Sequence, residues 1–158
     1  MNEASPDLAV ASDDYRIVTD DVVLSAQLHS SLVVCLYDAV EEHGALMHLR
    51  LAAPGHSRDP NLTDNTLSSD LALLDRAMRE LNAVSPRAQH WQAKLVAHSE
   101  DQASARVRCE GLQAFIGAFL QDAGIQVVSS MAHSDSSVSV RFRPAMGEVR
   151  TVTGPVAA

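Results

Sequence analysis

The chain has 158 residues and a formal net charge of -8 with its seven histidines neutral. This length suits one domain with its own core, and a hydrophobic content of 46% excludes a wholly disordered chain. The acidic balance comes without any cluster of lysine or arginine, which argues against nucleic acid or an anionic membrane as a partner.

No segment predicts membrane insertion or export. The longest nearly uncharged run, Val22 to Tyr37, contains polar residues and is shorter than a bilayer requires. The acidic N-terminus lacks the basic region of a secretory signal, so we expect a cytoplasmic protein. Cys35 and Cys109 form no CxxC motif, which favours reduced, buried thiols.

The first half of the chain predicts a polar terminus, strands, a loop and a helix. Residues 1–15 are typical of a flexible acidic terminus, and residues 16–158 form the single domain. A loop from His56 to Thr66 is rich in Pro, Asn, Asp and Ser, and a helix from Leu67 to Leu81 has apolar residues at helical spacing. Three strands precede that loop, the middle one apolar throughout and so buried on both faces: Val22–Leu24, Leu32–Tyr37 and Ala45–Leu51.

The second half predicts one more helix and five strands. An apolar stripe from Leu112 to Leu120 indicates a helix that ends at Gly124. The strands are Gln92–Ala97, Ala105–Arg108, Ile125–Val128, Val138–Phe142 and Glu148–Thr153. Strands and helices do not alternate regularly, which favours an α+β fold over a doubly wound sheet.

One stretch carries a resemblance to a known family. Residues 28–38 read Leu-His-Ser-Ser-Leu-Val-Val-Cys-Leu-Tyr-Asp, and Met47-His48 follows. This pattern resembles the CheD family of chemoreceptor glutamine deamidases, in which the stretch begins Leu-Gly-Ser-Cys. The similarity extends from about Val22 to Val152. It implies a layered α/β/β sandwich of mixed sheets with two main helices, like CheD and the catalytic domain of cytotoxic necrotizing factors.

The resemblance also implies a catalytic site. CheD proteins hydrolyse receptor glutamine to glutamate with a cysteine nucleophile, a histidine base and a threonine that orients the histidine. The matching positions here are Ser31, His48 and Ser25. The nucleophile is therefore changed, and a serine hydroxyl has a far higher pKa than a cysteine thiol.

Other departures from the family pattern surround the same site. The glycine before the family's Ser-Cys is His29 here, a second glycine pair is Ala97-His98, and a third is His133-Ser134. Histidine allows neither positive φ nor close backbone approach as glycine does. We therefore expect a remodelled groove for substrate or partner, formed by His29, Ser30, His98 and Ser134.

These departures favour a divergent CheD-like chemotaxis protein without deamidase activity, a pseudoenzyme that needs no cofactor. By the resemblance, its partner would be the cytoplasmic domain of a chemoreceptor or a CheC-type phosphatase. The alternative is an active Ser31–His48 amidohydrolase. A distance of about 3.2 Å or less between Ser31 Oγ and a His48 nitrogen, with backbone amides facing the hydroxyl, would favour that enzyme.

A further alternative is a metal site on the old active site. His29, His48, His98 and His133 all fall at positions that the family brings together, and imidazoles in one cleft suit Zn²⁺, Ni²⁺ or Cu²⁺. The competing interpretation is that loops carry these rings outward, scattered and solvated.

Overall fold

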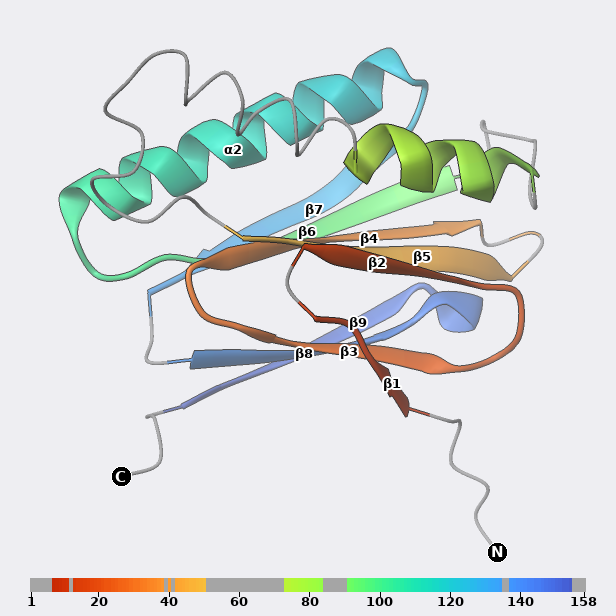
Figure 1. Cartoon of the computed structure of the whole chain (residues 1–158), viewed down its shortest axis with the longest axis horizontal. Coiled ribbons are helices and arrows are strands. Elements are labelled where there is room, and N and C mark those ends of the chain that lie inside the picture. The colour runs from red at the N-terminus through yellow and green to blue at the C-terminus, as the bar shows by residue number, and fades with distance from the viewer. Residues whose placement is uncertain are drawn as a thin grey trace, which may run out of the picture.

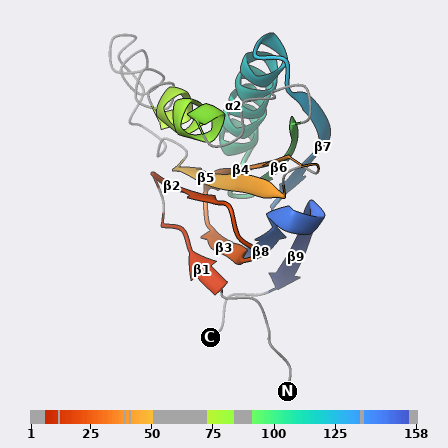
Figure 2. The same cartoon turned by 90° about the vertical axis from the view of Figure 1, so that its right-hand side faces the viewer.

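The computed structural model describes residues 7–11, 13–38, 40, 42–50, 73–83, 91–134 and 137–154. Two mixed β-sheets pack face to face, and two helices cover the outer face of the larger sheet (Figure 1). The view turned by 90° shows three layers, with helices above, the larger sheet in the middle and the smaller sheet below (Figure 2). The expected α+β fold with an α/β/β layering is confirmed.

The larger sheet has five strands in the order β2-β5-β4-β6-β7. All neighbours are antiparallel except β6 and β7, which are parallel and joined through the long helix α2, Ala103–Asp122. A second helical segment covers residues 73–83. The strands are β2 (Asp14–Val18), β4 (Ser31–Asp38), β5 (His43–Arg50), β6 (Trp91–His98) and β7 (Gln126–His133).

The smaller sheet has four strands in the order β1-β3-β8-β9. The pair β1 and β3 is parallel, and the other pairs are antiparallel. A short 3-10 helix, η2 (Pro144–Met146), connects the last two strands. The strands are β1 (Asp7–Ala9), β3 (Val23–Leu28), β8 (Ser137–Arg143) and β9 (Glu148–Gly154).

Strand β4 separates the two halves of the core. Every residue from Ser31 to Asp38 is buried, which confirms the burial on both faces predicted from its apolar run. Because successive side chains of a strand point to opposite faces, Val34 and Leu36 pack toward the helices. Val33 and Cys35 belong to the second cluster, which includes the inner face of the smaller sheet.

The predicted strand Ala105–Arg108 is wrong, because these residues lie inside α2. The alternation around Val107 imitates a strand, yet Val107 is 66% exposed. The buried residues Ala105 and Cys109 lie four positions apart and extend the apolar stripe of Leu112–Leu120 toward the N-terminus. The helix ends as predicted, with Gly124 at a φ of 83°.

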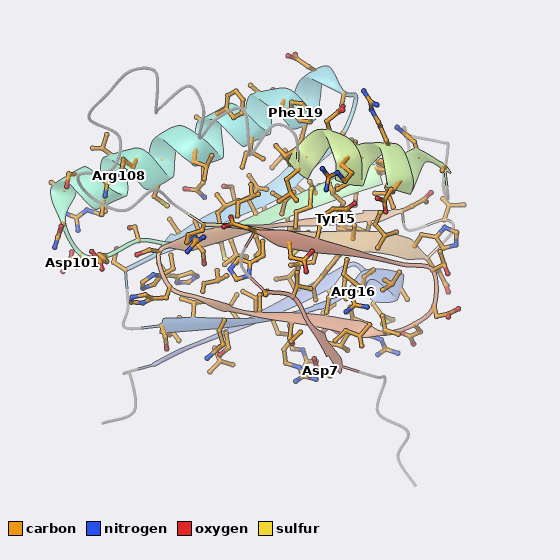
Figure 3. The ribbon with its side chains drawn as sticks, in the orientation of Figure 1. Asp7, Tyr15, Arg16, Asp101, Arg108 and Phe119 are labelled. Carbon is orange, nitrogen blue, oxygen red and sulfur yellow. The ribbon has the colours of Figure 1, made fainter. Side chains whose placement is uncertain are left out.

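The N-terminal segment differs from the flexible terminus expected for residues 1–15. Residues 7–9 and 14–18 form β1 and β2, which join different sheets. Tyr15 hydrogen-bonds Glu80 in the helical segment 73–83 (Figure 3). Asp7, on the opposite side of the molecule, pairs with Arg141 at 2.7 Å. Asp7 thus has a cationic partner in the fold, as does Asp13 with Arg50 at 2.8 Å, which local composition does not show.

Some expectations concern other parts of the chain. The predicted loop His56–Thr66, and residues 67–72 of the predicted helix, lie outside the described residues. Cys35 and Cys109 are free, buried thiols as expected. Among the helices described, none is long and apolar enough to cross a membrane.

Candidate active site

Ser31 and His48 come from neighbouring strands at the same end of the larger sheet. Ser31 begins β4 and pairs with Arg50 of β5, and His48 pairs with Val33 of β4. Strand alternation therefore turns both side chains toward the smaller sheet. Ser31 Oγ and His48 Nε2 lie 2.9 Å apart, which is hydrogen-bond distance for a hydroxyl and an imidazole.

The other nitrogen of His48 is held by the backbone. His48 Nδ1 lies 3.0 Å from the carbonyl oxygen of Val10, and a carbonyl can only accept. Nδ1 therefore carries the proton and donates a hydrogen bond to the Val10 carbonyl. The lone pair of Nε2 is then left to accept a hydrogen bond from the Ser31 hydroxyl. This is the tautomer that a general base toward Ser31 requires.

The surroundings favour a neutral imidazole. Burial lowers the pKa of His48, and the hydrogen bond to Val10 and the charge of Asp13 offset this only in part. His48 is 2% exposed and Ser31 is 1% exposed. A neutral histidine at hydrogen-bond distance can take the proton of a hydroxyl, so the pair has the geometry of a Ser–His catalytic dyad.

A backbone amide also faces the hydroxyl. The N–H of His29 donates to Ser31 Oγ at 3.2 Å, so the oxygen accepts one hydrogen bond while it donates another to His48. A donor aimed at this oxygen restrains its position beside His48. The site therefore meets the distance condition set for the enzyme alternative, and one backbone amide, that of His29, faces the hydroxyl.

Ser25 is linked to His48 through the backbone of Val10. Its carbonyl accepts a hydrogen bond from the N–H of Val10 at 2.8 Å, which places the carbonyl of Val10 that orients His48. The orienting role implied for the Ser25 side chain stays a prediction, while the group within hydrogen-bond distance of His48 Nδ1 is the Val10 carbonyl. A backbone oxygen has no signature in the sequence, which is why pattern analysis missed Val10.

His48 and Ser25 line a common cavity of ≈ 500 Å³. Strands β1, β3 and β8 supply most of its wall, including Gln27 and Ser139, and Val10 contributes as well. The cavity thus extends from the smaller sheet to His48 of β5.

Three of the four predicted groove residues come together next to Ser31. The rings of His29 and His98 stack with centroids 5.5 Å apart, and the N–H of Ser30 donates to His98 Nδ1 at 2.9 Å. His98 is also the β6 neighbour of Ser31 across the sheet. Ser134 lies exposed after the end of β7, and no contact between it and these residues is described.

The histidines do not form a metal site among the residues described. His133 is the β7 neighbour of His98, while both nitrogens of His48 have protein partners. No group of three or more His, Cys, Asp or Glu in the described part of the chain could hold a metal ion. The donor set shown does not fit Zn²⁺, Ni²⁺ or Cu²⁺, and metal binding stays a prediction for titration to test.

Comparison with known proteins adds an evolutionary relationship to this geometry. No family model matches the chain. It is 27% identical over 151 residues to a probable chemoreceptor glutamine deamidase CheD of Agrobacterium fabrum, across 95% of this chain and 81% of that protein. The protein of the same description from Rhizobium rhizogenes is 28% identical over 142 residues, across 89% of this chain and 76% of its own length. The chain is thus similar to these CheD proteins over most of its length.

The similarity to CheD covers the dyad, because an alignment over 95% of the chain includes both β4 and β5. A solved structure of a Neisseria meningitidis protein under the DUF152 family model is similar with a TM-score of 0.41 and 14% identity. That match covers 81% of this chain and 63% of that structure, and it is too weak to support an argument about this chain.

Proposed function

We propose that this chain is a serine-dependent amidohydrolase of the CheD type, which converts a glutamine side chain of a chemoreceptor to glutamate. The single observation that carries the proposal is the 2.9 Å contact between Ser31 Oγ and His48 Nε2. The substrate class comes from the relatives, which are described as probable chemoreceptor glutamine deamidases. In this proposal Ser31 occupies the place of the family's cysteine.

The proposed reaction has two steps. Ser31 Oγ attacks the side-chain amide carbon while His48 Nε2 takes the hydroxyl proton and returns it to the departing nitrogen, which leaves as ammonia. Water then attacks the resulting ester with His48 again as the base, and this step releases glutamate and regenerates Ser31. The Val10 carbonyl keeps His48 in the required tautomer through both steps and stabilises the imidazolium that forms.

The cavity supports the approach of a side chain. Its polar residues Ser25 and Gln27 can hydrogen-bond an amide, and His48 lines the same cavity. A glutamine side chain that enters here meets the imidazole first, and its amide carbon then needs to reach Ser31.

Release of ammonia from a chemoreceptor cytoplasmic fragment tests the proposal. Ser31→Ala and His48→Ala should each remove the activity, by up to about 10⁶-fold where the residues act as a unit. His43→Ala changes another histidine of β5 and serves as the matched control, which should keep the wild-type rate. Ammonia release no faster than that of Ser31→Ala would refute the enzyme.

A second candidate function is binding of a receptor or a CheC-type phosphatase without turnover. The observation that favours it is the 1% exposure of Ser31, which leaves little room for direct attack. Calorimetry of wild type and Ser31→Ala against both partners separates the two functions. Equal affinities without ammonia release support binding alone, whereas no binding to either partner excludes it.

A further inference from the structure

The chain crosses from the smaller sheet to the larger sheet within two residues. Strand β3 ends at Leu28 and β4 begins at Ser31, so His29 and Ser30 make the whole connection. Ser30 has a φ of 54°, in the left-handed region that favours glycine. The residue immediately before the nucleophile is thus held in a conformation that serine seldom adopts.

His98 holds this conformation from the neighbouring strand. Its Nδ1 accepts the Ser30 N–H at 2.9 Å, and its side chain is 1% exposed. A ring nitrogen that accepts a hydrogen bond carries no proton itself, so Nδ1 of His98 is the unprotonated nitrogen of the ring. The His29 ring stacks on the His98 ring, which adds a second contact between β6 and the connection.

The same connection fixes the nucleophile. The His29 N–H donates to Ser31 Oγ at 3.2 Å, so rotation of the Ser30 backbone would move the donor and the hydroxyl together. His98 acts on the residues before the nucleophile: its Nδ1 accepts from the backbone of Ser30, and its ring stacks on the ring of His29.

We propose that His98 is a positioning residue for the Ser31–His48 dyad. Its Nδ1 keeps Ser30 in the left-handed conformation, and this keeps Ser31 Oγ within reach of His48 Nε2. The effect of His98 on the rate rests on the proposed function. Its effect on the position of Ser30 and Ser31 rests on the hydrogen bonds alone. Ser30 therefore adopts a positive φ, which glycine would adopt freely, with the help of a hydrogen bond from its N–H to His98 on the neighbouring strand.

Two substitutions isolate the Nδ1 atom. His98→Asn places an acceptor oxygen the same number of bonds from Cα as Nδ1, whereas His98→Gln places its amide near the position of Nε2. Both variants keep a polar, neutral side chain in the same buried space. His98→Asn should keep kcat within about threefold of wild type, and His98→Gln should lower kcat by about tenfold or more with a smaller change in KM.

Ser30→Gly supplies the suppressor. Glycine adopts positive φ without the steric cost that serine has, so the connection no longer needs His98 to hold it. Ser30→Gly should therefore restore most of the rate in a His98→Gln background, measured against the rate of Ser30→Gly alone. Thermal unfolding of each variant checks that differences in rate do not come from loss of the fold.

The ¹⁵N spectra of the histidine side chains give a readout that does not depend on turnover. The His48 Nε2 signal should be the same in wild type and His98→Asn, and in His98→Gln it should move toward the signal of Ser31→Ala. This pattern without ammonia release would refute the proposed function and leave the positioning role intact. Equal spectra in His98→Asn and His98→Gln would overturn the positioning role, and so would a wild type that releases ammonia but shows no rescue of His98→Gln by Ser30→Gly.

Discussion

The carbonyl oxygen of Val10 and Nδ1 of His48 lie 3.0 Å apart, so a residue just after β1 orients the proposed base. Val10 is 5% exposed, and its own N–H is bonded to Ser25 of β3. The base is therefore held from the smaller sheet, while it hydrogen-bonds the nucleophile within the larger sheet.

Removal of the N-terminal segment should disturb the dyad. Deletion of residues 1–11 removes β1 and the Val10 carbonyl, so His48 loses the acceptor that fixes its tautomer. We expect kcat for ammonia release to fall by roughly 10- to 100-fold, because orientation of the base contributes on this scale.

Deletion of residues 1–6 is the matched control, since it keeps β1 and Val10. This shorter deletion should keep the wild-type kcat and the wild-type ¹⁵N signals of His48. Equal rates for the two deletions would show that the Val10 carbonyl has no part in orientation.

Ser31→Cys should create one thiol that reacts much faster than the native thiols. Burial raises the pKa of both Cys35 and Cys109, which keeps them protonated and unreactive in the folded chain. A thiol at position 31 faces His48 Nε2 and can transfer its proton there. Iodoacetamide followed by peptide mass spectrometry should locate the first adduct at position 31, whereas earlier labelling of Cys35 or Cys109 would contradict the site.

The pH dependence should follow His48. Burial lowers the pKa of His48 below its ordinary value of 6.5, so the folded chain binds this proton less readily than the unfolded chain does. The contribution of neutral His48 to stability is therefore complete above pH 6.5 and is lost as the pH falls through the lowered pKa. The acid limb of kcat/KM should have its midpoint in the same region, below 6.5.

An NMR titration of His48 checks this expectation without a substrate. A midpoint at or above 6.5 would contradict the effect of burial. His43→Ala, on the same strand, should leave the His48 midpoint unchanged.

Substitution of Gly44 should damage the fold, whereas substitution of Gly117 should not. A Cβ at Gly44 would lie 2.4 Å from the Pro144 side chain and 2.6 Å from the Leu36 carbonyl. Gly44→Ala should lower the free energy of unfolding by roughly 1–3 kcal/mol, because β5 must move away from η2 and β4. A Cβ at Gly117 in α2 would meet no atom within 4 Å, so Gly117→Ala should raise the free energy of unfolding by up to about 1 kcal/mol. Urea unfolding of both variants measures the contrast, and equal effects would contradict it.

The sequence predicts most of the layered core because its apolar periods are strong. The continuous run of β4 and the stripe around Ile116 are set by burial, and both elements form where these patterns lie. The strand predicted at Ala105–Arg108 failed because four residues of alternation fit both a strand and an exposed helical turn. The buried Cys109 could have decided between them.

The site is predictable only as far as side chains define it. Ser31 and His48 stand at positions that match a family motif, and antiparallel pairing of their strands brings them together. The third partner is a carbonyl of Val10, whose position depends on pairing between β1 and β3. No local pattern near Val10 indicates that pairing, because the segment has the acidic composition of a solvated terminus.

The placement of β1 determines at which stage of folding the proposed site becomes complete, and at which stage of unfolding it is lost. Ser31 and His48 can meet once β4 and β5 pair, but the Val10 carbonyl arrives only when the smaller sheet has formed and docked. A partly unfolded chain that releases β1 alone would retain both catalytic side chains and lose the tautomer control. Turnover would then fall at a lower denaturant concentration than global unfolding requires, so its decline would report the undocking of the two sheets.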